Sequence, residues 1–313
     1  MNNKSKRLHL NEMQVPLPDY LFEGIDFDAI RFYPLESLEE ELRRLISSYV
    51  GVTEDEVFIY SGIDGLIELM YKALHDSAFV VPKPSYYVYE QEALRQGVHL
   101  NTIELSHDYR LTESFFKQSE GAVCVVVNPN NPTGNILLQQ NEAERLLLNA
   151  QYLVVDEAYY EFSHVTMVPL VKEWDNLIVF RTFSKAFGLA GARISYMVSN
   201  QRTIERFSRY CEIYRVPTLS LMLAKNALLN PEYMYSYVDM VKTEMSHLLD
   251  VLTTLDIRAR GSDGNFILVD RDFGECLVAN GFNVRLMEND ARVTVTAPPE
   301  SEEIINIAKN YRR

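Results

Sequence analysis

Cysteine, long apolar runs and surplus positive charge are all scarce in this sequence. The three cysteines, Cys124, Cys211 and Cys276, lie far apart without a C-x-x-C pair, which argues against a disulfide framework. The longest unbroken apolar run, Ala122–Val127, is far too short to cross a bilayer. Thirty Lys and Arg against 44 Asp and Glu give a net charge of -14, which would repel nucleic acid. We therefore expect neither a membrane nor a nucleic acid as partner.

Metal-binding and targeting patterns are missing too. The six histidines are scattered, with no H-E-x-x-H and no ligand-like spacing to a cysteine or carboxylate, so we expect no metal site. The first residues, Met1–Leu10, carry charge but no apolar stretch of the length that a signal peptide needs. These observations predict a cytoplasmic protein. The length of 313 residues suggests about two domains.

What the sequence does contain is an alternation of short apolar runs with segments of helical periodicity. The runs expected as strands are Val57–Tyr60, Ala78–Val81, Val123–Val127, Tyr152–Val155 and Leu177–Phe180. Apolar strands that alternate with helices are typical of a mainly parallel sheet covered on both faces. We therefore predict an α/β protein.

The clearest helical segment covers residues 38–50. Apolar residues recur there at helical spacing, and Gly51 stands where a helix C-cap belongs. Ser37 and Glu40 match the S-x-x-E pattern of a capping box. We expect the helix to begin at this box and to end at Gly51.

The alternation weakens after about residue 230. A long helix is expected over Tyr233–Thr254, followed by strands at Ile267–Val269 and Val293–Thr296. We interpret this region as a smaller α+β domain. The chain is thus predicted to form an N-terminal arm packed on the small domain (1–30), a large domain (31–228) and a small C-terminal domain (229–313).

Polar and turn-forming residues follow four of the predicted strands. Ser61–Gly65 leads into a helix and could offer backbone N–H groups to a phosphate or be a simple capped turn. Asn128–Gly134 is rich in Asn and Pro. Asp156 could pair with a cation or cap a helix. Arg181–Arg193 carries a lysine among apolar residues. Ligands bind beyond the carboxyl ends of parallel strands, so these segments predict a site.

Together the strand ends resemble the fold type I pyridoxal-phosphate enzymes, and among them the histidinol-phosphate aminotransferase-like branch. The most specific parts are Asn131-Pro132-Thr133-Gly134, Asp156-Glu157-Ala158-Tyr159, and Ser184-Lys185 with Arg193 eight residues later. The resemblance implies pyridoxal 5'-phosphate as cofactor and a homodimer as assembly. It implies transfer of an amino group between an amino acid or amino alcohol phosphate and a 2-oxo acid.

The resemblance also implies roles for single residues. Lys185 corresponds to the lysine that binds the cofactor covalently and moves protons, and Asp156 to the carboxylate that pairs with the pyridinium nitrogen. The other implied cofactor contacts are the ring-stacking Tyr86, the phenolic-oxygen partners Asn131 and Tyr159, and the phosphate cradle of Ile63, Asp64, Ser184 and Arg193.

Further contacts are implied at the two ends of the chain. Arg292 corresponds to the arginine that clamps the substrate carboxylate, while Arg285 is either a second such group or a solvated rim charge. Asn11 opens the segment Asn-Glu-Met-Gln, which departs from the family's N-E-N-P and is expected to contact substrate. Tyr33 corresponds to a tyrosine that reaches the cofactor phosphate of the partner subunit.

Two other functions stay open at this point. Decarboxylation, as in threonine-phosphate decarboxylase-like relatives, uses the same cofactor residues, because the outcome depends on which substrate bond stands perpendicular to the ring. A cofactor-binding regulator without turnover would need a DNA-binding module, and the segment before the first helix shows no helix-turn-helix pattern. Amino-group transfer is the function that we predict.

Overall fold

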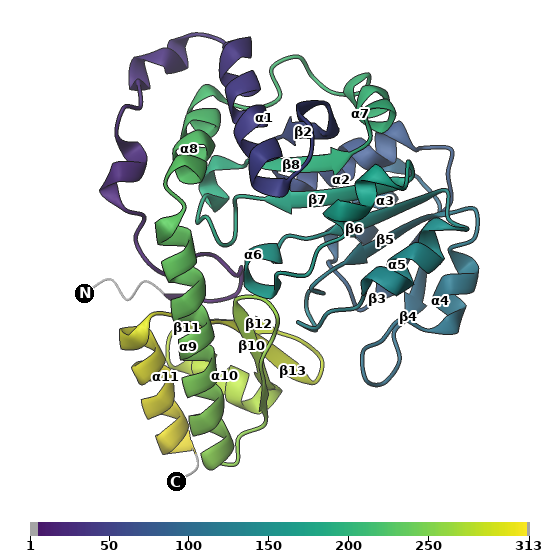
Figure 1. Cartoon of the computed structure of the whole chain (residues 1–313). Coiled ribbons are helices and arrows are strands. Elements are labelled where there is room, and N and C mark those ends of the chain that lie inside the picture. The colour runs from purple at the N-terminus through teal and green to yellow at the C-terminus, as the bar shows by residue number, and fades with distance from the viewer. Residues whose placement is uncertain (1–5, 312–313) are drawn as a thin grey trace.

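The computed structural model describes residues 6–311, and its largest sheet has seven strands in the order β2-β8-β7-β6-β5-β3-β4 (Figure 1). These strands are β2 (Val57–Tyr60), β3 (Phe79–Lys83), β4 (Leu100–Glu104), β5 (Val123–Val127), β6 (Tyr152–Asp156), β7 (Leu177–Thr182) and β8 (Ser195–Ser199). Neighbouring strands are parallel except at β8, which is antiparallel to both β2 and β7. The predicted α/β class with a mainly parallel sheet is confirmed.

The middle of this sheet is apolar on both faces. Every residue of β5 and β7 is buried, which requires cover above and below because successive side chains of a strand point to opposite faces. The helices of this part are α1 (Glu36–Val50), α2 (Gly62–Ala73), α3 (Val88–Gln96), α4 (Glu113–Gln118), α5 (Gln140–Leu147), α6 (Tyr160–Ser163), α7 (Gln201–Ser208) and α8 (Thr218–Leu229).

Two strands of this seven-stranded sheet were not predicted. β4 lies at the sheet edge and is only half buried, so its sequence Leu-Asn-Thr-Ile-Glu lacks an apolar run. β8 is fully buried but begins and ends with serine. The hydroxyls of Ser195 and Ser199 donate to Thr182 Oγ1 at 2.9 Å and to the Leu177 carbonyl at 2.6 Å, so both are satisfied inside the sheet.

The expected start of the first helix is wrong. Helix α1 begins at Glu36 with Leu35 as its N-cap, so Ser37 is already inside the helix and cannot cap it. A capping box forms instead ahead of β2, where Glu56 accepts hydrogen bonds from the backbone and hydroxyl of Thr53. The predicted end is confirmed, because Gly51 adopts the left-handed conformation of a C-cap.

The C-terminal part contains a second, antiparallel sheet in the order β12-β13-β10-β9. Its strands are β9 (Ala259–Arg260), β10 (Phe266–Asp270), β12 (Arg285–Leu286) and β13 (Asp290–Thr294), and its helices are α9 (Glu232–Thr254), α10 (Arg271–Ala279) and α11 (Pro298–Tyr311). Figure 1 shows α9 running alongside α11 in this part. The long helix is present, starting one residue earlier than predicted and ending at Thr254 as predicted. Both predicted strands are present, with ends displaced by one to three residues.

The N-terminal arm contacts both parts of the molecule. Strand β1 (Lys6–Arg7) pairs with β11 (Phe282–Asn283) of the C-terminal part. Farther along, Leu21 is buried and its carbonyl accepts a hydrogen bond of 2.9 Å from Asn226 in α8. The arm, residues 1–30, is predicted to pack on the small domain. Residues 19–31 instead pack on α8, where the apolar side chain of Leu21 is buried.

Candidate active site

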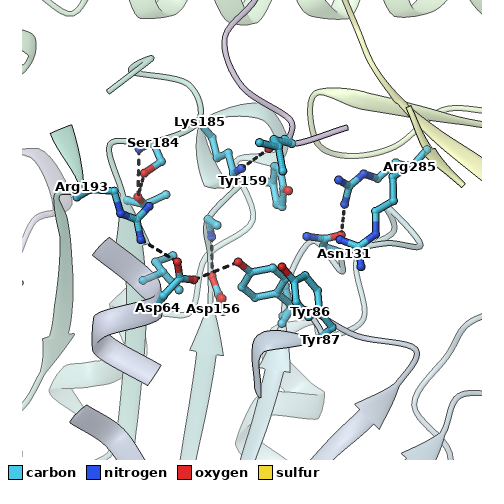
Figure 2. A pocket seen from close by; sticks show the side chains of 16 residues that line it. Asp64, Tyr86, Tyr87, Asn131, Asp156, Tyr159, Ser184, Lys185, Arg193 and Arg285 are labelled. Atoms are coloured by element: carbon cyan, nitrogen blue, oxygen red, sulfur yellow. Dashed lines mark hydrogen bonds and ion pairs between the residues drawn. The ribbon is translucent and has the colours of Figure 1, made fainter. Parts of the chain in front are cut away.

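A cavity lies at the carboxyl ends of β5, β6 and β7 (Figure 2). It is lined by Leu10, Ile63, Asp64, Tyr86, Tyr87, Val127, Asn131, Asp156, Ala158, Tyr159, Thr182, Ser184, Lys185, Arg193, Arg285 and Arg292. The lining therefore comes from the arm, the large sheet and the small sheet. All the site residues that the sequence predicts are gathered here except Asn11 and Tyr33.

Asp156 forms the buried floor of the cavity. Its carboxylate is 2% exposed and accepts hydrogen bonds from Tyr89 Oη at 3.0 Å and from the Ala158 backbone at 3.1 Å. Burial raises the pKa of Asp156 to about 7, and no ion pair within residues 6–311 offsets that cost. A cationic N–H placed against this carboxylate would restore its charged form.

Lys185 reaches the cavity from the turn that follows β7. The neighbouring rings of Phe183 and Phe187 are buried and anchor this turn in the core. The Lys185 amine donates a hydrogen bond of 2.9 Å to the carbonyl of Leu10 and lies 5.8 Å from the Tyr159 ring centroid. Among residues 6–311, Lys185 is the one amine that lines the cavity.

One end of the cavity is built to receive an anion. The N-terminus of α2 points there, and the first backbone N–H groups of a helix have no partner within the helix. Gly62 has a φ of +78°, and a Cβ at this position would stand 2.7 Å from Arg193 Nη2. Arg193 pairs at 2.7 Å with Asp64, whose other oxygen accepts from Tyr86 Oη at 3.0 Å. An anion here would draw on backbone N–H groups and Arg193 rather than on the Asp64 carboxylate.

Two arginines meet at the opposite end. Arg285 on β12 and Arg292 on β13 stand directly opposite each other in the small sheet. Arg292 is 2% exposed; it donates to Asn131 Oδ1 and to the His9 carbonyl, and its Nε has no partner within the described chain. Burial lowers the pKa of Arg292, and the nearby positive charge of Arg285 lowers it further.

Neither arginine forms an ion pair among residues 6–311. The Arg285 guanidinium lies over the Tyr87 ring at 4.8 Å, and that of Arg292 over the Phe266 ring at 5.4 Å. Like charges directly opposite on paired strands are unfavourable unless an anion joins them. The arrangement is therefore suited to an acidic ligand.

Two predicted residues lie outside the cavity. Asn11 is buried behind its wall and donates a hydrogen bond of 2.9 Å to Tyr159 Oη. Tyr33 is 72% exposed and stacks on Tyr214 with ring centroids 4.2 Å apart. Tyr33 does not enter the cavity of its own chain.

Some lining residues were missed in the sequence. Tyr87 lines the cavity directly after Tyr86, and the clustering of tyrosines after a strand is the sequence signal that could have found it. Thr182 donates a hydrogen bond of 2.9 Å to Ser184 Oγ, a contact that only the tight turn reveals. Leu10 contributes its backbone carbonyl, which carries no sequence signal.

Comparison with known proteins gives a consistent result. The sequence model of the aminotransferase class I and II family matches residues 12–307. A histidinol-phosphate aminotransferase from Thermotoga maritima is 32% identical over 311 residues, covering 95% of this chain and 91% of the relative.

Solved structures show the same fold. Histidinol-phosphate aminotransferase from Sinorhizobium meliloti, in complex with pyridoxal-5'-phosphate, has a TM-score of 0.85 at 21% identity and covers 98% of this chain and 91% of its own. L-threonine-O-3-phosphate decarboxylase from Porphyromonas gingivalis has a TM-score of 0.83 at 22% identity, with 98% and 99% covered. The fold is therefore shared between enzymes of both reactions that the sequence left open.

Proposed function

The chain belongs to the class I and II aminotransferase family, whose members use pyridoxal phosphate, and on that premise we propose that its amino donor is histidinol phosphate and its acceptor a 2-oxo acid. The observation that carries the choice of donor is the pair Arg285 and Arg292. These two guanidinium groups form no ion pair among residues 6–311, and together they suit a phosphate dianion better than they suit a single carboxylate.

The residues of the cavity fit the cofactor. The α2 N-terminus, Ser184 and Arg193 would hold its phosphate, and the buried Asp156 would accept a hydrogen bond from its protonated ring nitrogen. Position 62 is a glycine, which leaves the space next to Arg193 that a Cβ would occupy. When bound, pyridoxal phosphate supplies an electron sink for the bond that breaks at the substrate.

The protein's own groups would then orient the donor and move its proton. Tyr86 would stack on the ring, and Asn131 and Tyr159 would donate or accept at its phenolic oxygen. Arg292, which is rigidly buried, would hold the acidic end of the donor. Lys185 is the amine within reach of the cavity, so we assign to it both the attachment of the cofactor and the transfer of the donor's α-proton.

We further propose a cytoplasmic homodimer that serves amino-acid biosynthesis. This assembly is supported by an exposed apolar stretch at the end of the arm and just after it, made of Phe27, Ile30, Phe32 and Tyr33. No helix among residues 6–311 is both long and apolar enough to cross a bilayer.

The test of the proposed function is product identification. The purified protein is mixed with histidinol phosphate and a panel of 2-oxo acids, and products are identified by mass spectrometry. We expect the 2-oxo acid to gain an amino group while the donor becomes a carbonyl compound with all its carbons. The surface variant Arg145→Ala should behave as wild type, since its pairing with Glu113 is exposed and remote from the cavity. A parallel mixture contains threonine phosphate in place of histidinol phosphate. Release of CO₂ from it, with no amino transfer in either mixture, would overturn the proposal in favour of decarboxylation.

A further inference from the structure

A fully buried ion pair lies beside the floor of the cavity, between Arg181 of β7 and Glu157 at the end of β6. Arg181 is 2% exposed and Glu157 is completely buried. Arg181 Nη2 lies 2.9 Å from Glu157 Oε2, and Arg181 Nε donates to the same oxygen at 2.9 Å. Neither residue lines the cavity, so neither contacts a ligand there.

The pair is held by a complete set of contacts. The Met167 backbone donates to Glu157 Oε1 at 2.6 Å, and the Thr166 hydroxyl donates to Oε2 at 2.8 Å. Arg181 Nη2 donates to Thr166 Oγ1 at 2.8 Å, and its guanidinium carbon lies 3.4 Å from the Tyr160 ring centroid. Such contacts fix the pair in one geometry, because every alternative leaves a buried polar group unpaired.

Each member of the pair adjoins a residue of the site. Glu157 follows Asp156 directly, and its backbone N–H donates to the Phe180 carbonyl of β7 at 2.9 Å. Arg181 precedes Thr182, whose hydroxyl accepts from the Ser184 backbone at 3.1 Å, one residue before Lys185. Successive strand residues point to opposite faces, so the pair ties the two strand ends together from the side away from the cavity.

Stability alone is a poor reason for such a pair. Replacing both members of a buried ion pair with apolar residues of similar size is often neutral or stabilising, whereas removing one member is strongly destabilising. What the charged pair adds over an apolar one is a single defined separation of the two strand ends.

We propose that Arg181 and Glu157 are positioning residues, which set the separation between Asp156 and Lys185 and thereby the affinity of the site for pyridoxal phosphate. The proposal rests on the cofactor-binding roles assigned above to Asp156 and Lys185. Both residues act through the strand ends that they join, not by contact with the cofactor.

Other titratable groups pack around the pair. Glu161 is buried, accepts a hydrogen bond of 3.4 Å from Tyr49 Oη, and has its pKa raised to about 7 by burial. Tyr196 is buried beside Arg181, and burial raises the pKa of its hydroxyl. Among residues 6–311, Glu157 is the carboxylate that forms an ion pair with Arg181, so loss of either member leaves the other without its ion-pair partner.

The test uses Glu157→Gln, Arg181→Met and the double variant carrying both changes. For each full-length protein, the melting temperature without added cofactor and the dissociation constant for pyridoxal phosphate are measured, the latter by equilibrium dialysis. The visible absorbance of the bound cofactor is recorded across pH. The control is Leu252→Ala, which removes a buried side chain from α9 far along the chain from the cavity and lowers stability by the cavity mechanism.

We expect both single variants to lose melting temperature and the double variant to recover most of it. Cofactor affinity should nevertheless stay about tenfold below wild type in the double variant, with a displaced absorbance midpoint, because the strand ends are no longer fixed. Leu252→Ala should lose melting temperature without losing affinity. Recovery of both properties in the double variant, or an equal loss of affinity in Leu252→Ala, would overturn the proposal.

A second variant keeps the test decisive if the single variants fail to fold. Arg181→Lys retains the charge but cannot reproduce the planar fork, so it should fold and still bind the cofactor more weakly than wild type. Unchanged affinity in Arg181→Lys would overturn the proposal. A separate measurement tests the cofactor-binding role assigned to Lys185. If that role is wrong, borohydride reduction of the cofactor-loaded wild-type protein leaves no adduct on Lys185.

Discussion

The amine of Lys185 donates a hydrogen bond of 2.9 Å to the backbone carbonyl of Leu10, which ties the proposed catalytic lysine to the N-terminal arm. The same stretch of the arm is held by the small sheet, since Thr294 donates to the Leu8 carbonyl at 3.0 Å and accepts from the Asn11 backbone at 3.1 Å. The arm therefore joins the small sheet to the reactive end of the large one.

Removing the lysine should loosen the arm. In Lys185→Met the hydrogen bond to Leu10 is lost, and a net contribution of about 1 kcal/mol corresponds to roughly fivefold faster opening. We expect the Asn11 amide, which is bound to Thr294, to exchange its hydrogen faster by about that factor. Exchange of the Leu252 amide in α9 serves as the internal reference. Equal exchange of Asn11 in variant and wild type would show that the arm is held without Lys185.

Arg292 should dominate the binding of the acidic group of the donor. Truncation of a buried charged partner costs roughly 2–5 kcal/mol, so Arg292→Ala should lower kcat/KM by about two to three orders of magnitude while the cofactor stays bound. Arg292→Lys should restore only part of the loss, since an ammonium lacks the planar fork. Steady-state kinetics with histidinol phosphate provides the measurement.

The half-exposed Arg285 provides the comparison for Arg292. Arg285→Ala should have a smaller effect, because its guanidinium lies over Tyr87 and is partly solvated. If Arg292→Ala retains full kcat/KM and Arg285→Ala does not, the acidic group is held at the rim and the assignment of Arg292 is wrong.

Asp156 should make the cofactor-free protein less stable as the pH rises. Burial raises its folded-state pKa from the ordinary value of 3.8 to about 7, so the folded protein keeps a proton that the unfolded chain has lost. The stability from protonated Asp156 is complete below its unfolded pKa and is lost as pH rises toward 7. Between pH 5 and 8 the wild type should lose up to roughly 3 kcal/mol more unfolding free energy than Asp156→Asn in urea titrations.

Glu161→Gln offers a parallel variant, because burial also raises the pKa of Glu161 to about 7. Each single variant should remove a part of the wild-type slope. An identical slope in wild type and Asp156→Asn would mean that Asp156 is ionised in the cofactor-free fold.

Tyr33 should act across a subunit interface. It lies exposed on Tyr214 in its own chain, so a role at the cofactor phosphate requires a partner subunit. Tyr33→Phe should weaken cofactor binding by about 1 kcal/mol or somewhat more, the scale of a hydrogen bond to a charged group. Tyr235→Phe, also exposed, is the control. A monomer in light scattering at micromolar concentration would contradict this prediction.

Much of the large sheet could be predicted because its strands are continuous apolar runs. A strand buried on both faces, such as β5 with its Val-Cys-Val-Val-Val, is a short run of β-branched and apolar residues, which is the strand signal that a sequence carries most clearly. Strand β8 could not be predicted, because it begins and ends with serine. The hydroxyls of Ser195 and Ser199 form hydrogen bonds to β7, and no local sequence pattern indicates these contacts.

The site divides in the same way. Residues at the ends of predicted strands, such as Asp156 and Lys185, could be placed because parallel strands share one ligand-binding edge. The Leu10 carbonyl could not, since a backbone group carries no residue signature and reaches the cavity only through the return of the arm. The buried ion pair between Arg181 and Glu157 could not be predicted either, because only the register of β6 and β7 brings the two residues together.

The most direct test of the central claim is borohydride reduction of the cofactor-loaded protein, followed by peptide mapping. Reduction makes the bond between the cofactor and its lysine permanent, so mass spectrometry locates the residue. Lys72, an exposed lysine paired with Glu68 on α2, should remain unmodified and serves as the reference. We predict one pyridoxyl adduct, on Lys185. An adduct confined to another lysine, or none on the loaded protein, would contradict the account.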